Sequence, residues 1–261
     1  MTTLRLLPAL ALLAALLIGC GSPDSGSPAD TTADDTTTSD ATGPAYPSWS
    51  YEGETGPAQW ADLSVDYAAC AGDQQSPIDL TAASSPTSPP GMQTSYAAAQ
   101  GAVFDTGHAI QVNTTGGTLT YDGTTYELAQ FHVHAPSEHI VDGSSSPAEI
   151  HFVHQTGDSL AVLGVFVEEG SAANPALDGW VEGDSTTISV NASDLLPEAR
   201  SFYTYRGSLT TPPCSEIVRW VVLDTPIEAS AAQLQTLRAQ HDGNARPVQP
   251  LGDRTLLRVS P

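Results

Sequence analysis

The sequence contains no lysine, and its eight basic side chains, all arginines, stand against thirty aspartates and glutamates. The formal net charge is −22 at pH 7. A surface so poor in positive charge argues against nucleic acid and anionic membranes as partners. We interpret the acidity as a solvated surface that keeps the protein soluble, with adaptation to salty or acidic surroundings as the alternative.

Long apolar runs are also absent: residues 6–18 fall short of the roughly 20 residues that a membrane-spanning helix needs. Arg5 precedes this run, and residues 17–20 (LIGC) resemble the lipobox of bacterial lipoproteins. We therefore predict that residues 1–20 are a lipoprotein signal peptide. A lipidated Cys20 then anchors an exported protein to the bacterial cell envelope, at the outer face of the cytoplasmic membrane or in the periplasm. A plain secretory signal, which releases a soluble protein, is the alternative.

Aromatic and branched aliphatic residues are missing from residues 21–45, which consist only of Ser, Thr, Asp, Gly, Pro and Ala. Such a segment cannot bury enough apolar surface to fold, so it is predicted to be a disordered linker. Every Trp, Tyr and Phe falls within residues 46–261, which are long enough for one well-buried domain.

Cysteine is scarce, and once Cys20 is set aside only Cys70 and Cys214 remain. An even pair in an exported protein predicts a disulfide. In the loop-entropy model, closing so long a loop disfavours the unfolded chain by about 4 to 5 kcal/mol. Two buried free thiols are the alternative.

Helical periodicity is sparse, whereas β-rich runs recur along the domain. The runs cover residues 109–112, 118–127, 128–134, 149–154, 160–167 and 217–223, with Gly, Asn, Asp or Pro between them. The helix-like segments are residues 231–240, which Ser230 can cap, and a short turn at residues 175–180. The pattern predicts a mainly β fold.

Two histidines of one predicted strand, His132 and His134, are separated by a single residue, and His151 lies on the next strand. Residues two apart in a strand point to the same face, so these side chains can converge. Three neutral imidazoles are typical ligands of a zinc ion that keeps one position open for chemistry. A lone His-x-His is more often an ordinary surface or core pair, so the rest of the chain must decide. His154, three residues after His151, faces the other side of the strand and is expected in the core or at the surface.

An ordered set of motifs extends over nearly the whole domain: residues 49–51 (WSY), 75–79 (QSPID), 107–109 (GHA), 130–134 (QFHVH), 137–139 (SEH), 148–151 (AEIH), 160–164 (LAVLG), 207–214 (GSLTTPPC) and 246–251 (RPVQPL). Together they resemble the α-class carbonic anhydrases of the bacterial, exported kind. The resemblance implies one domain over residues 46–261, built on a large central, mixed but mostly antiparallel twisted sheet with a few short peripheral helices. It also implies a lyase that hydrates carbon dioxide reversibly to bicarbonate and a proton by means of a zinc-bound hydroxide.

The resemblance implies that Zn²⁺ is the cofactor, with His132, His134 and His151 as its ligands. Uncharged ligands leave the full double charge on the metal, which favours loss of a proton from bound water near neutral pH. Further residues of the family's site orient the ligands, the nucleophile or the substrate. Gln130, Glu149 and the main chain at Asn244 match the acceptors behind the three ligands, and His139 with Tyr205 matches the next layer. Glu138 and Thr210 match the pair that orients the hydroxide, Thr211 lines the same pocket, and Val153, Val162, Leu209, Val218 and Trp220 match the apolar wall for carbon dioxide.

Proton release is assigned by the same resemblance to His108, whose imidazole can accept and release a proton near neutral pH. Tyr51 and Gln111 match residues that order the relay waters. Thr106 stands where an asparagine is common in the family, and Ser50 where glycine is usual. An exposed histidine without a role is the alternative for His108.

Two other functions use the same residues. One is a catalytically weak carbonic-anhydrase-like module that binds zinc or acts as a receptor, although such relatives typically lose a zinc histidine. The other is ester hydrolysis, a side activity in a narrow apolar pocket. The predicted partners are carbon dioxide and bicarbonate, with no nucleic acid and with a membrane only through the lipid anchor. No oligomeric state is predicted.

Overall fold

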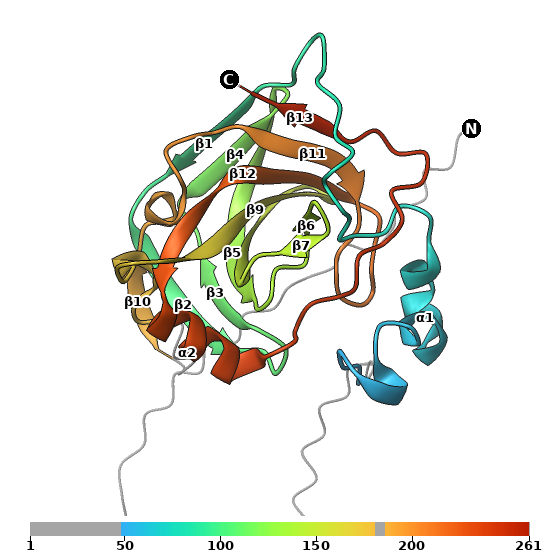
Figure 1. Ribbon diagram of the computed structural model, residues 1–261, viewed down its shortest axis with the longest axis horizontal. Helices are drawn as coiled ribbons and strands as arrows, with labels where there is room; N and C mark the ends of the chain where they lie inside the picture. The colour runs from blue at the N-terminus through green and yellow to red at the C-terminus, as the bar shows by residue number, and fades with distance from the viewer. Residues whose placement is uncertain (1–47, 181–185, 261) are drawn as a thin grey trace, which may run out of the picture. The chain divides into compact units, whose positions relative to one another are not determined.

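The computed structural model describes residues 48–180 and 186–260 (Figure 1). The predicted signal peptide and linker, residues 1–20 and 21–45, lie outside the described residues. The strands are β1 (Met92–Tyr96), β2 (Ala99–Asp105), β3 (Ile110–Thr114), β4 (Gly117–Tyr121), β5 (Thr124–His134), β6 (Ile140–Val141), β7 (Ser144–Ser145), β8 (Ala148–Thr156), β9 (Ser159–Gly170), β10 (Thr187–Val190), β11 (Phe202–Gly207), β12 (Val218–Ser230) and β13 (Leu257–Val259). The α-helices are α1 (Trp60–Leu63) and α2 (Ala231–His241), and the 3-10 helices are η1 (Gly53–Thr55), η2 (Val65–Ala71), η3 (Pro175–Leu177) and η4 (Ala192–Leu195).

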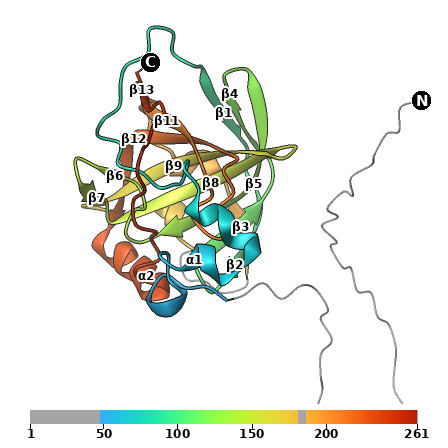
Figure 2. The same ribbon diagram turned by 90° about the vertical axis from the view of Figure 1, so that its right-hand side faces the viewer.

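Within the described residues, eleven strands form one sheet, in the order β10-β2-β3-β5-β8-β9-β12-β11-β13, with β4 also pairing with β5 and β1 with β4. The β9–β12 ladder is parallel and the other ladders of this sheet are antiparallel. Figure 1 shows the twist of this sheet, and Figure 2 shows the β6–β7 ribbon standing off it. The predicted mixed, mostly antiparallel sheet with short helices is confirmed.

Apolar side chains pack on both faces of the sheet, because its central strands are covered on each side. β9 is buried over most of its length. Alternate residues of β8 separate to the two faces: Ile150 and Phe152 join the larger core, whereas Val153 packs against the smaller one, around Trp220. Burying one such side chain stabilises the fold by about 1.5–3 kcal/mol. The site described below occupies the face of Val153.

The helix α2 begins as the sequence predicts. The Ser230 hydroxyl accepts the backbone N–H of Gln233, and the Gln233 side chain reaches back to Ser230 in a capping box. Leu234 and Leu237 are buried beneath the helix. At residues 175–180 the expected short turn is the 3-10 helix η3. Among the described residues, no helix is long and apolar enough to cross a membrane.

One predicted run is wrong. The pattern over residues 118–127 predicts a continuous strand, but the structure divides it between β4 and β5 with a two-residue turn. Asp122 and Gly123 form this turn with positive φ angles of 48° and 80°. Asp-Gly is a common type I′ hairpin pair, because both central residues of that turn need positive φ.

A disulfide joins Cys70 of η2 to Cys214, as predicted. Both half-cystines pack with Trp60 and Tyr67 in a small apolar cluster beside the sheet. The bond therefore ties the N-terminal 3-10 segment to the loop that carries Thr210 and Thr211.

Candidate active site

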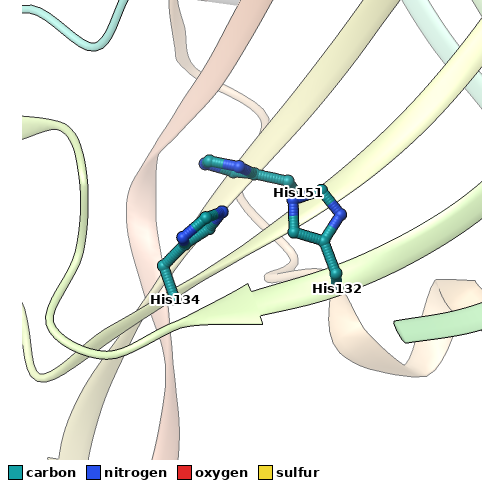
Figure 3. A group of neighbouring side chains, drawn as sticks. All are labelled: His132, His134 and His151. Atoms are coloured by element: carbon teal, nitrogen blue, oxygen red, sulfur yellow. The ribbon is translucent and has the colours of Figure 1, made fainter. Parts of the chain in front are cut away.

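Three histidines converge because β5 and β8 are antiparallel neighbours in a fixed register. His132 lies directly opposite His151, and His134 lies two residues further along β5 on the same face. The ring centroids are 5.0 Å apart for His132 and His134, 5.3 Å for His132 and His151, and 4.7 Å for His134 and His151. Figure 3 shows the three rings pointing toward a common centre.

Each imidazole has an acceptor behind it. His132 Nδ1 lies 2.9 Å from Gln130 Oε1, and His134 Nδ1 lies 2.6 Å from the Asn244 carbonyl oxygen. His151 Nε2 lies 3.0 Å from Glu149 Oε1. A carbonyl or carboxylate oxygen can only accept, so each of these ring nitrogens carries the hydrogen and the other has its lone pair free. The free nitrogens are Nε2 of His132 and His134 and Nδ1 of His151.

The three histidines fit a metal ion. They each offer a ligand atom, and these atoms lie within 4.8 Å of one another. Burial lowers the pKa of all three imidazoles, most strongly that of His132, so they are neutral at pH 7. The buried His134 Nε2 has no hydrogen-bond partner, which is costly for a polar atom unless a ligand satisfies it. Three neutral nitrogen donors are a typical zinc set.

Glu149 organises the layer behind the ligands. Its Oε2 accepts the backbone N–H groups of Glu138 (3.0 Å) and His139 (2.9 Å), and its Oε1 accepts His139 Nδ1–H (2.8 Å). His139 Nε2 lies 2.7 Å from the Tyr205 hydroxyl. Burial acts to raise the pKa of Glu149, but the charges and hydrogen bonds of His139 and His151 outweigh it and hold that pKa well below its usual range. His139, Glu149 and His151 also lie close enough to hold a metal, but these contacts already engage the carboxylate.

Gly164 of β9 provides the space that this carboxylate occupies. It faces His151 across the β8–β9 ladder, and a Cβ at this position would lie 2.8 Å from Glu149 Oε1. Any side chain here displaces the acceptor behind a ligand.

Glu138 is fully buried beside the histidines. Its Oε1 accepts the backbone N–H of Arg246 (2.9 Å), and its Oε2 lies 3.5 Å from His134 Nε2. Burial raises the pKa of Glu138 to about 7, while the charge of His151, the Arg246 N–H and a hydrogen bond from the Thr210 side chain act in the opposite direction. Thr210 therefore lies close to Glu138, and the role of the two as a pair that orients a nucleophile stays a prediction.

A cavity of about 260 Å³ opens above the histidines. Its lining includes the apolar side chains of Val153, Val162, Leu209 and Trp220. Its polar lining residues, apart from the three histidines, are Tyr51, Thr106, His108, Gln111, Gln130, Thr210 and Thr211. A larger hollow of about 760 Å³ is lined by Arg206, Arg219 and Arg254 among others but by no histidine, so the smaller cavity is the active-site candidate.

His108 stands at the rim of the cavity, on the turn between β2 and β3. Burial lowers the pKa of its imidazole, and the charge of His241 lowers it further, while Asp105 acts to raise it. The Tyr51 hydroxyl is buried with no hydrogen-bond partner, and burial raises its pKa above the usual tyrosine range. It therefore stays protonated and can hydrogen-bond a pocket water.

The structure refines the expectations for Val218 and Thr106 and confirms the one for His154. Val218 is buried near Trp220 but does not line the cavity, because it sits at the first residue of β12. The Thr106 hydroxyl donates to the Ala109 carbonyl oxygen (2.9 Å) and accepts the Ala109 N–H (3.0 Å), so it shapes its own turn. His154 is buried on the opposite face from the ligands, with Nδ1 3.0 Å from the Phe152 carbonyl oxygen, as expected.

Sequence reasoning gave no role to two features of the pocket. Trp49 lines the cavity and stacks on His108; the second aromatic residue of the WSY motif, Tyr51, was the available signal. Arg246 supplies the N–H to Glu138 and extends its guanidinium beneath, donating to Gln75 Oε1 and the Ser76 carbonyl oxygen, each at 2.8 Å. A backbone donor leaves no mark on residue type, so this contact had no signal.

Three histidines that could hold a metal ion lie beside a partly apolar cavity on a large mixed sheet, an arrangement that favours an enzyme of metal-assisted hydration. The model of the eukaryotic-type carbonic anhydrase family matches residues 55–260. A carbonic anhydrase of Pectobacterium carotovorum is 42% identical over 223 residues, which cover 80% of this chain and 90% of that protein.

Two solved structures are similar as well. The Photobacterium profundum α-carbonic anhydrase has a TM-score of 0.74 and 42% identity, covering 80% of this chain and 100% of that one. The Thermovibrio ammonificans α-carbonic anhydrase in complex with the inhibitor sulfanilamide has a TM-score of 0.75 and 40% identity, covering 81% of this chain and 99% of that one. The chain belongs to the α-carbonic anhydrase family. It is a carbonate dehydratase, an enzyme of reversible carbon dioxide hydration.

Proposed function

We propose that this chain hydrates carbon dioxide with a zinc ion held by His132, His134 and His151. The observation that carries the proposal is the set of three neutral imidazoles, each oriented by its own acceptor and aimed at one centre. When bound there, zinc supplies a Lewis acid that allows a water molecule to lose its proton near neutral pH.

Thr210 and Glu138 orient the nucleophile. The Thr210 hydroxyl donates its hydrogen to the Glu138 carboxylate, so only lone pairs remain on its oxygen. Anything bound between Thr210 and the histidines must therefore donate its own hydrogen to Thr210, and its free lone pair points into the cavity. The Arg246 N–H supports the ionised form of Glu138 in this arrangement.

Carbon dioxide is small and apolar, and it binds against the wall of Val153, Val162, Leu209 and Trp220. This wall lies in the same cavity as the oriented nucleophile, so it brings the carbon within reach of attack. Thr211, next to Thr210 in the same lining, offers polar contact to the bicarbonate that forms.

The proton of the reaction leaves through His108. The rim position, the neutral imidazole and the polar lining residues Tyr51 and Gln111 support this role, because a water chain past these residues can connect the histidine centre to the rim. Ordering of the relay waters rests on Tyr51 and Gln111 here, since Thr106 is engaged in its turn.

The decisive experiment is stopped-flow carbon dioxide hydration by the purified protein, before zinc removal, after it and after zinc is restored. We expect one zinc per chain and activity that is lost and regained with the metal. A fully zinc-loaded protein without activity would indicate a zinc-binding or receptor module in place of an enzyme. Because the Thermovibrio ammonificans relative binds sulfanilamide as an inhibitor, we also propose sulfanilamide as an inhibitor of this chain.

The protein is further proposed to act outside the cytoplasm, tethered by lipid at Cys20. Two observations support the proposal: the lipobox-like residues 17–20 in the sequence, and the Cys70–Cys214 disulfide, which is typical of oxidising compartments.

A further inference from the structure

Seven histidines occur in the chain, and five of them are accounted for in the interior. His132, His134 and His151 form the metal site, His139 braces Glu149, and His154 is a core residue. The remaining two lie on neighbouring segments: His108 is in the β2–β3 turn, and His241 ends α2, which reaches that turn at Asp105.

Asp105 connects His241 to the turn that carries His108. Its Oδ1 accepts the backbone N–H of Gly107 at 2.8 Å and lies 2.8 Å from His241 Nε2. The turn that begins at this carboxylate carries His108, whose backbone carbonyl oxygen accepts Asn244 Nδ2–H at 3.0 Å. The end of α2 and the residues after it are thus fastened to the His108 turn at two points.

The pair has the protonation pattern of a relay. The Gly107 N–H and the His241 contact lower the pKa of Asp105, so it is ionised at neutral pH. A carboxylate can only accept, so His241 Nε2 carries a hydrogen, and in the neutral imidazole Nδ1 then holds a lone pair. Within the described residues no protein atom hydrogen-bonds Nδ1. That side chain is 17% exposed and the Asp105 side chain 46% exposed, so both reach solvent.

We propose that Asp105 and His241 form a second proton station, which accepts the proton from His108 and delivers it to buffer; the proposal rests on the shuttle role given to His108 above. In this step the His108 imidazolium gives its proton through water to His241 Nδ1. His108 becomes neutral again, and His241 becomes an imidazolium stabilised by ionised Asp105. A buffer base then removes the proton from His241. The lysine-free sequence offers no amine side chain as a substitute.

The test compares His241→Gln with wild type in carbon dioxide hydration at low and high imidazole buffer. Glutamine keeps a hydrogen-bond donor for Asp105 but cannot carry the proton. We expect kcat in weak buffer to fall several-fold, kcat/KM to stay unchanged, and high imidazole to restore kcat. Gln235→Ala, at an exposed position of the same helix, is the control and should behave as wild type. Zinc content and thermal unfolding show whether His241→Gln folds properly. If it does not, Asp105→Asn replaces it, with the same expected fall of kcat in weak buffer.

His108→Ala and the double variant His108→Ala/His241→Gln complete the test. If the stations act in series, His241→Gln adds no loss once His108 is gone. If His108→Ala lowers kcat but His241→Gln does not, the second station is rejected and the shuttle remains. If His108→Ala leaves kcat unchanged in weak buffer, the shuttle assignment fails and the second station fails with it. If His241→Gln lowers kcat/KM and imidazole does not restore it, His241 only stabilises the β2–β3 turn, and the relay is rejected.

Discussion

The imidazole of His108 lies flat on the indole of Trp49, with ring centroids 3.7 Å apart and ring planes 13° apart. Trp49 is itself held edge-on by Tyr51 and Trp60. The shuttle candidate is therefore supported by an aromatic cluster on one face, and it lines the cavity.

Removing this support should change the protonation of His108. Burial is the main cause of its lowered pKa, and burial disfavours the charged form. Trp49→Ala should therefore raise the pKa of His108 toward the ordinary imidazole value. Less of the residue is then neutral below pH 7, and the pH profile of kcat shifts to higher pH. NMR titration of the His108 ring measures the shift, and an unchanged or lower pKa contradicts the prediction.

The Thr210 hydroxyl should be needed for rate and not for folding. Thr210→Val keeps the shape of the side chain but removes the acceptor that orients the nucleophile. We expect kcat/KM for carbon dioxide to fall by about 10²-fold, the effect of losing one oriented polar group in an active site. Thr210→Ser, which keeps the hydroxyl, should retain most of the activity. Equal losses in the two variants would assign the effect to packing.

Gln130 should tune metal affinity from behind His132. Loss of such an acceptor weakens zinc binding by about 10- to 100-fold, so Gln130→Leu should bind zinc correspondingly less tightly in a chelator competition. Gln111 is a matched control, since it lies opposite His132 in the β3–β5 ladder but bonds Asn113 instead of a ligand. Gln111→Leu should keep wild-type zinc affinity, and an equal loss in both variants would refute a specific role of Gln130.

The disulfide should contribute strongly to stability, because it links residues 144 positions apart. For a loop of that length the chain-entropy model gives about 5 kcal/mol, an upper value that measured disulfides often do not reach. The Cys70→Ser/Cys214→Ser variant should therefore unfold at lower urea concentration than the oxidised protein. Reductant should lower the midpoint of the wild type but not that of the variant. If the variant and the oxidised protein unfold together, the bond has no stabilising role.

If a lipid on Cys20 anchors the protein, replacing this cysteine should change the compartment in which the protein is found. Cys20→Ala removes the thiol that would carry the lipid, so the protein should move from the membrane fraction to the soluble fraction or the medium. Cell fractionation with an antibody to the folded domain makes the measurement. A Cys20→Ala protein that stays with the membranes contradicts the proposal.

Several parts of the fold and site followed from the sequence because residue type alone signals them. The spacing of His132 and His134 indicates strand alternation, and together with His151 they share the chemistry of metal ligands. Ser230 indicates the start of α2. Other parts depend on backbone contacts or on partners distant in sequence. The Arg246 N–H on Glu138 has no residue-type signal, and neither does the pairing of Asp105 with His241, 136 residues apart. Val218 shares the strand parity of Trp220, but parity does not report where along β12 the cavity ends.

The register of β5 contains an irregularity between Leu128 and Gln130, where one residue, Ala129, is left without a partner on β8. Before it, Leu128 faces the larger core; after it, that face is taken by Phe131 and Val133, and the cavity face by Gln130, His132 and His134. The bulge thus shifts the alternation of side chains along the strand by one residue. If Ala129 were paired in the regular way, Leu128 before it and the histidines after it would point to the same face of the sheet. Deleting Ala129 would make Leu128 and Gln130 consecutive residues opposite His154 and Val153, so a regular strand would still hold the core on one face and the histidines on the other.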